Sequence, residues 1–213
     1  LSEIPVPQSR PHDLTCELLR AVLSQWARAA RPRAQVGCNL VVRWDRGRPQ
    51  VGVDPDVYLV DPAPPEGDAA TSLRLWEPGH HAPLVAVEVV SPGHPTKDYA
   101  VAPAKYAASG TSELWVFDPQ LAGPPAHGGP HRIQLWTREP TGALVRVYAG
   151  EGPVFSPAVG GWLFSTLEGE RLRIASDREG TQWWPTPEEA ERAAKEAALA
   201  RVAELEARLA ARG

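Results

Sequence analysis

The chain has 213 residues, 43% of them hydrophobic and 23% charged, which is typical of a soluble globular domain with an appendage. The net charge of -4 argues against broad electrostatic binding to nucleic acid and does not exclude a local basic cleft. No apolar run approaches the roughly 20 residues of a membrane span, and the opening LSEIPVPQSR has no apolar signal core. We therefore expect a cytoplasmic protein without a membrane segment, with Cys16 and Cys38 reduced and structural.

The first half of the chain begins with a helix and continues with strands. Apolar residues at helical spacing predict a helix over 11–30, with Pro32 ending the pattern. Short apolar runs then predict strands over 34–44 and 56–60. The stretch 61–83 is rich in Pro, Gly and Asp and predicts a long loop.

The middle of the chain predicts a strand, a helix and a second strand. Residues 83–90, PLVAVEVV, form a nearly unbroken apolar run, which indicates a strand buried on both faces. A helix is expected over 97–109, ended by Gly110, and a second buried strand over 112–118. This order implies that the two strands are parallel. Residues 131–149 then predict a β-hairpin, followed by short strands near 162–164 and 172–174.

The C-terminal stretch differs in composition from the rest. Residues 186–213 are rich in Ala, Glu and Arg, with Thr186 as the expected N-cap and Pro187 in the first turn of a helix. We expect residues 1–185 to form the main domain and 186–213 a helical tail. A short heptad-like seam leaves open a coiled-coil contact or a lone solvated helix.

Asp56, Glu88 and Lys105 are the residues most suited to chemistry. Asp56 lies at the edge of one apolar run and Glu88 inside the next, so both carboxylates could meet at one end of a sheet. Two converging carboxylates suit Mg²⁺, and a nearby ammonium suits a phosphate. The chain has only three lysines against nineteen arginines, and Lys97 and Lys105 both follow Glu88 closely. The pattern is that of a metal-dependent nuclease.

Each of these residues also has a structural interpretation. Asp56 could be an acidic strand terminus that faces water, Glu88 could pair with an arginine, and Lys105 could be a solvated cation. His80 lies in a Gly- and Pro-rich loop, where a solvated histidine is expected. His12, near the start of the first helix, is expected to be exposed, with a place in the cleft as the alternative.

Four ordered blocks of the chain resemble the PD-(D/E)XK nuclease superfamily, and in particular its Uma-type branch of bacterial restriction endonucleases. The blocks cover residues 55–120. They are Pro55-Asp56; Glu88-Val89 with Ser91-Pro92; Asp98 with Tyr106; and Gly110, Glu113, Trp115, Asp118 and Pro119.

The resemblance implies a restriction-endonuclease-like α/β (α+β) fold, with a mixed central sheet flanked by helices, an extra β-hairpin and a C-terminal helix. It implies a DNA endonuclease that uses Mg²⁺ or Mn²⁺. Because cutting a duplex needs two active sites, we expect a symmetric homodimer. The metal would be held by Asp56, Glu88 and the backbone carbonyl of Val89, with Glu17 as an additional acid.

The chain departs from the family pattern at the catalytic lysine. Val90 stands where the superfamily has its lysine, and Ala102 stands where the branch has it. Lys105 is therefore the candidate and Lys97 its rival. The alternatives are a catalytically inactive nuclease-fold module used for binding or assembly, and an enzyme that acts on RNA or another phosphodiester.

Overall fold

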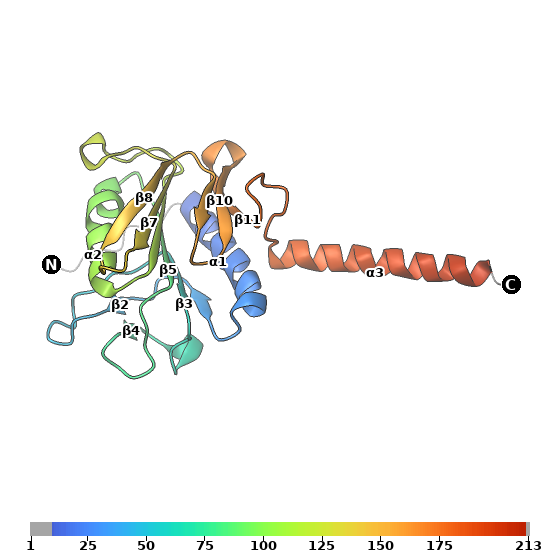
Figure 1. Ribbon diagram of the computed structural model, residues 1–213, viewed down its shortest axis with the longest axis horizontal. Coiled ribbons are helices and arrows are strands. Elements are labelled where there is room, and N and C mark those ends of the chain that lie inside the picture. Colours follow the sequence, from blue (N-terminus) through green and yellow to red (C-terminus); the bar gives the residue numbers. More distant parts are fainter. Residues whose placement is uncertain (1–9, 212–213) are drawn as a thin grey trace.

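The computed structural model describes residues 10–211 (Figure 1). The opening segment, for which we expected no signal core, and the last two residues of the tail lie outside this range. The elements are α1 (Arg10–Ala30), β1 (Gln35–Gly37), β2 (Val42–Arg43), β3 (Val57–Val60), β4 (Leu73–Arg74), β5 (Val85–Val89), α2 (Ala102–Ser109), β6 (Glu113–Phe117), β7 (Ile133–Arg138), β8 (Leu144–Gly150), β9 (Val154–Ser156), β10 (Gly161–Thr166), β11 (Arg171–Ala175) and α3 (Pro187–Ala210). Short helical turns lie at Gly67–Ala69 (η1), Lys97–Val101 (η2), Pro125–His127 (η3) and Leu167–Gly169 (η4).

A mixed six-stranded sheet forms the centre of the fold, as the sequence predicts. Its strand order is β1-β3-β5-β6-β7-β8. Only β5 and β6 pair in parallel, as expected for two strands joined by a helix, and the other neighbours are antiparallel. The hairpin predicted over 131–149 is present as β7 and β8.

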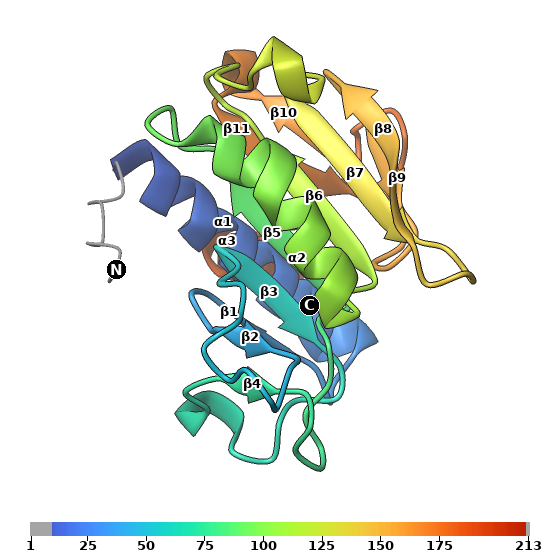
Figure 2. The same ribbon diagram turned by 90° about the vertical axis from the view of Figure 1, so that its left-hand side faces the viewer.

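Helices cover both faces of this sheet (Figures 1 and 2). One face packs on α1 and on a smaller sheet of order β11-β10-β9, through side chains such as Val87 and Trp115. The opposite face packs on α2 through Ala86, Leu114 and Tyr106. Every residue of β5 and of β6 is buried, which explains why both strands read as unbroken apolar runs. The predicted α+β fold is confirmed.

Three local features were not predicted. The expected loop over 61–83 contains β4, which pairs with β2 in a separate two-stranded sheet, and the sequence pattern does not predict β9. The expected helix over 97–109 is divided into a π-helical turn, η2, and α2. Gly110 ends α2 in the left-handed conformation with φ 83°, as expected for a glycine there.

The C-terminal helix α3 points away from the rest of the molecule (Figure 1). Thr186 and Glu189 form a capping box at its start, and Glu189 also pairs with Arg173 at 3.0 Å. Just before it, Trp184 stacks on Trp26 of α1 with ring centroids 5.2 Å apart. No residue of α3 from 187 to 210 is buried, so this helix adds little to the core. Within residues 10–211, no helix is both long and apolar enough to cross a membrane.

Candidate active site

Asp56 and Glu88 face each other on neighbouring strands. Asp56 directly precedes β3, which pairs antiparallel with β5 so that Val57 lies opposite Val87. One step further along this register brings Asp56 opposite Glu88. Side chains opposite each other in antiparallel strands have Cβ atoms about 4.5–5.5 Å apart. The pairing of β3 with β5 therefore brings the two predicted acids together.

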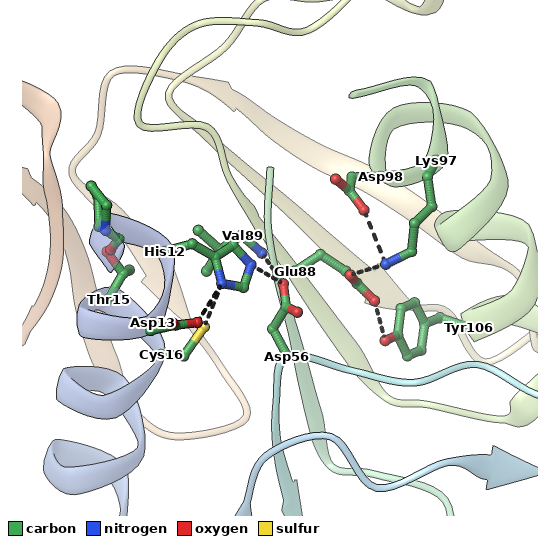
Figure 3. A network of polar contacts seen from close by, with 11 residues as sticks. His12, Asp13, Thr15, Cys16, Asp56, Glu88, Val89, Lys97, Asp98 and Tyr106 are labelled. Carbon is green, nitrogen blue, oxygen red and sulfur yellow. Dashed lines mark hydrogen bonds and ion pairs between the residues drawn. The ribbon is translucent and has the colours of Figure 1, made fainter. Parts of the chain in front are cut away.

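The Asp56 carboxylate is fixed to its surroundings by one of its oxygens. Oδ2 accepts a hydrogen bond from the Val89 backbone N–H at 2.7 Å and lies 3.2 Å from Nε2 of His12 (Figure 3). At the end of β5, this side-chain oxygen thus takes the place of a backbone carbonyl as the acceptor for the Val89 N–H. Asp56 is only 6% exposed, which excludes the solvated strand end considered from the sequence. Val89, expected as a ligand through its carbonyl, lies directly beside this acid.

Glu88 is fully buried, with 0% exposure, between two polar partners. The Tyr106 hydroxyl donates to Oε1 at 2.5 Å, and the Lys97 ammonium donates to Oε2 at 3.3 Å. Burial raises the pKa of Glu88 well above its usual value, and the nearby Asp56 charge raises it further. The arginine partner considered from the sequence is absent among the described residues, where Lys97 is the cation at Glu88.

Lys97 and Asp98 complete the group of charges. The Lys97 ammonium also lies 3.7 Å from Oδ1 of Asp98, a buried atom with no hydrogen-bond partner in the described chain. Burial raises the pKa of Asp98 to about 6, opposed by Lys97 and reinforced by Asp56. Burial alone would lower the pKa of Lys97, but Glu88 and Asp98 more than reverse this and hold it above its usual value.

Lys105, the lysine favoured from the sequence, is exposed on α2, and no hydrogen bond or ion pair within residues 10–211 links it to the acids. Its rival Lys97 is the lysine that contacts Glu88. The π turn explains the difference, because its wider turn rotates residues 97–101 relative to α2. Helical spacing counted from Asp98 therefore does not bring Lys105 to the acids, whereas Tyr106 still reaches Glu88.

His12 is buried at 7% exposure and contacts Asp56, so its expected exposure is wrong and its place beside the acids is correct. The sequence does contain a sign of this burial. His12 lies at helical spacing from Cys16, Leu19 and Leu23, which form the buried face of α1. Glu17, the additional acid suggested by the family, is exposed on the helix.

The last matched block of the sequence is structural. The buried Glu113 carboxylate accepts hydrogen bonds from the Trp115 indole at 2.5 Å, from the Ser156 hydroxyl and from the Ala158 N–H, and so joins β6 to the region of β9. Asp118 accepts hydrogen bonds from the Tyr99 hydroxyl and from the backbone of the loop that follows β6. These acids are fully engaged in holding the fold.

His80 is buried, contrary to the solvated histidine expected from the sequence. Its Nδ1 accepts a hydrogen bond from the Arg74 N–H at 3.0 Å, and its Nε2 lies 3.2 Å from Glu66. Because Nδ1 accepts this hydrogen bond, the neutral ring carries its proton on Nε2, the nitrogen that faces the Glu66 carboxylate. His80 therefore holds the loop together.

The site as a whole contains three buried carboxylates around one ammonium. When ionised, Asp56, Glu88 and Asp98 carry more negative charge than Lys97 neutralises. Burial, together with repulsion between these acids, therefore raises the pKa values of Glu88 and Asp98. Carboxylate oxygens are the ligands that Mg²⁺ and Mn²⁺ prefer, and Asp98 offers a buried oxygen without a hydrogen bond. The residues present therefore fit a hard divalent cation.

Comparison with known sequences identifies the family. Residues 3–127, more than half of the chain, match the model of the Uma2 family, which is described as "Putative restriction endonuclease". The chain belongs to the Uma2 family. This confirms the resemblance seen in the sequence and supports a nuclease function.

One solved structure similar to this Uma2 chain is described as a "putative nuclease belonging to DUF820" from Anabaena variabilis ATCC 29413. The two share 16% sequence identity with a TM-score of 0.48, over 73% of this chain and 76% of the other. No curated protein matches the Uma2 chain.

Proposed function

We propose that this protein is a divalent-metal-dependent DNA endonuclease. Mg²⁺ or Mn²⁺ would be held by Asp56, Glu88 and the backbone carbonyl of Val89. The observation that carries this proposal is the placement of Asp56, directly before β3, opposite Glu88 of β5, in a buried site with excess negative charge. A divalent cation would offset the burial and the repulsion from Asp56 that raise the pKa of Glu88.

The residues around the acids have separate tasks in this proposal. The bound ion would polarise the phosphodiester and lower the pKa of a water. Lys97 combines a contact to Glu88 with a side chain that is 54% exposed, so its ammonium can also meet a phosphate and stabilise the charge that develops there. Tyr106 and His12 position Glu88 and Asp56 by direct contacts. We propose Lys97, in place of Lys105, as the catalytic lysine.

The substrate, the assembly and the location rest on the family and on general arguments. The family description names restriction endonucleases, so duplex DNA is the proposed substrate. Cutting both strands requires two active sites, which a symmetric homodimer supplies. The cytoplasmic location expected from the sequence belongs to the same proposal.

A catalytically inactive nuclease-fold module is the second candidate. The observation that favours it is the engagement of both Glu88 oxygens, one by Tyr106 and one by Lys97. In such a protein the ammonium would replace the metal permanently. An active enzyme differs because each carboxylate oxygen has a second lone pair that remains available to an ion.

Cleavage of supercoiled plasmid tests the proposal. The purified protein is incubated with plasmid and Mg²⁺ or Mn²⁺, with EDTA as the blank, beside Asp56→Asn and Glu88→Gln. Glu170→Gln is the matched control, because Glu170 is an exposed acid between β10 and β11. We expect metal-dependent nicking by the wild-type protein and by the control, and its loss in both site variants.

Two outcomes would contradict the proposal. Cleavage that persists unchanged in Asp56→Asn and Glu88→Gln would reject these acids as the catalytic centre. A wild-type protein that neither cleaves DNA nor binds Mn²⁺ in calorimetry would be the inactive module.

A further inference from the structure

A second set of donor atoms shares Asp56 but faces α1. Cys16 Sγ lies 3.6 Å from Nδ1 of His12, and Nε2 of the same ring lies 3.2 Å from Oδ2 of Asp56 (Figure 3). One ligand atom from each of the three residues falls within 4.8 Å of the other two, and all three residues are buried. His12 and Cys16 are one turn apart on α1, so the helix presents both side chains to the acid.

The donors of this set differ in kind from those of the carboxylate site. A thiolate and an imidazole favour zinc and similar ions, whereas carboxylates alone favour Mg²⁺ or Mn²⁺. Helix α1, the start of β3 and strand β5 therefore present two donor sets that meet at Asp56. One combines Asp56 with Glu88, and the other combines Asp56 with His12 and Cys16.

The other such cluster in the described chain lacks this capacity. Glu66, Glu77 and His80 also lie within 4.8 Å of one another. There, however, the Arg74 N–H donates to Nδ1 of His80 and keeps the proton on Nε2, the nitrogen that faces the two acids. At His12, Asp56 faces Nε2 and the Cys16 thiol faces Nδ1, and within residues 10–211 no backbone N–H donates to either nitrogen, so Nδ1 is left to accept a metal on the thiol side.

We propose that His12, Cys16 and Asp56 form a binding site for a thiophilic divalent cation of the zinc type. Binding replaces the thiol proton of Cys16 with the metal and releases that proton to the solvent, while the imidazole and the carboxylate bind as neutral and anionic ligands. Water or a substrate oxygen would take the fourth position, as in zinc sites with three protein ligands.

The observed spacing is close to that of such a site. Zinc lies about 2.0–2.1 Å from nitrogen and about 2.3 Å from sulfur, so tetrahedral donors are roughly 3.4–3.6 Å apart. The Cys16 Sγ to His12 Nδ1 distance of 3.6 Å has this value, whereas the 3.2 Å contact to Asp56 is made by the other ring nitrogen, and the three donors together lie within 4.8 Å of one another. Because one ion takes one nitrogen, the ring or the thiol turns when the metal binds.

The site has a consequence for the hard-cation centre, and this consequence rests on the proposed function. A zinc-type ion on the α1 side would bind the same Asp56 carboxylate that serves Mg²⁺ or Mn²⁺, and its positive charge would repel the second cation. Occupation by zinc would therefore compete with the ion that supports cleavage and lower the rate.

Cobalt(II) absorbance tests metal binding without any assay of activity. Co²⁺ is titrated into the full chain, and the sulfur-to-metal charge-transfer band in the near ultraviolet reports a thiolate ligand. Cys38→Ser is the matched control, because Cys38 is also a free cysteine but lies outside the cluster. We expect a saturable band in the wild-type protein and in Cys38→Ser, and none in Cys16→Ser. His12→Asn should weaken binding by about 10- to 100-fold or more, since it removes a ligand outright.

Absence of the band from the wild-type protein, or its persistence in Cys16→Ser, would overturn the proposal. A thermal-unfolding scan guards against a variant that merely fails to fold: Zn²⁺ should raise the midpoint of the wild-type protein and of Cys38→Ser, and equal rises in Cys16→Ser would also overturn it. Zn²⁺ is then added to Mn²⁺-dependent plasmid cleavage. A cobalt band without inhibition would refute the competition alone, and a cobalt band in a protein that never cleaves would refute the proposed function alone.

Discussion

The Lys97 ammonium lies 3.3 Å from the Glu88 carboxylate, across the turn that joins β5 to α2. Among the described residues, Lys97 and His12 are the basic groups that contact the three acids of the site. Lys105, eight residues later in the chain, lies on the exposed side of α2. The two lysines therefore form a natural pair of test and control.

Lys97→Gln should lower the rate of DNA cleavage by about 10²-fold, because it removes a charge that stabilises the reacting phosphate. Lys105→Gln should leave the rate unchanged. Single-turnover cleavage at saturating Mn²⁺ measures both. The opposite result, with loss in Lys105→Gln and none in Lys97→Gln, would assign the catalytic role to Lys105.

Tyr106→Phe should destabilise the protein by about 1.5–3 kcal/mol, because the buried Glu88 carboxylate loses the hydroxyl that donates to it at 2.5 Å. Urea unfolding at neutral pH measures the change. Tyr148→Phe is the control, since its hydroxyl only accepts from the Gly152 N–H and touches no carboxylate in the described chain. A smaller loss in Tyr106→Phe than in Tyr148→Phe would contradict the assigned role.

The raised pKa of Asp98 predicts a pH dependence of stability. The pKa is 3.8 for an unperturbed carboxyl and about 6 in the folded protein, chiefly because of burial. Between these values the folded state holds a proton that the unfolded state has lost, so Asp98 favours folding at low pH, and this contribution falls as pH rises. Relative to Asp98→Asn, the metal-free wild-type protein should lose stability from pH 4 to pH 6.

Chemical unfolding of both proteins at several pH values checks this expectation. The other titratable groups are shared, so the difference between the two proteins reports Asp98 together with its effect on the pKa of Glu88. A difference that stays constant, or that moves in favour of the wild-type protein as pH rises, would contradict the raised pKa.

The tail predicts a separation between folding and assembly. No residue of α3 is buried, while Leu199, Val202, Leu205 and Leu209 are exposed along it. A chain ending at residue 190 keeps Glu189 and its pair with Arg173, so it should retain the thermal midpoint of the full chain. If the proposed homodimer forms through this helix, light scattering should show a dimer for the full chain and a monomer for the shorter one. A large fall in the midpoint would show that the tail belongs to the folded domain.

The central sheet and the proximity of Asp56 and Glu88 could be predicted from the sequence. Unbroken apolar runs at 83–90 and 112–118 indicate strands buried on both faces, and both are central in the sheet. A carboxylate inside such a run requires a partner, which is why Glu88 could be singled out. Asp56 is predicted by its place at the edge of the neighbouring run.

The details around the acids depend on geometry that a pattern does not contain. The identity of the lysine follows from a π turn, and helical spacing assumes that no such turn is present. The two-residue strands β2 and β4 are too short to produce a periodic signal. The burial of His12 was readable from its phase on α1, but the start of a helix suggested exposure.

Binding of Mn²⁺ to the metal-free protein, followed by the electron paramagnetic resonance of the free ion, tests the central claim most directly. The claim is that Asp56 and Glu88 together hold one divalent cation. The account predicts that the wild-type protein and Glu170→Gln remove Mn²⁺ from solution with one site per chain, and that Asp56→Asn and Glu88→Gln each lose this site. Equal binding by all four proteins, or no binding by the wild-type protein, would contradict it.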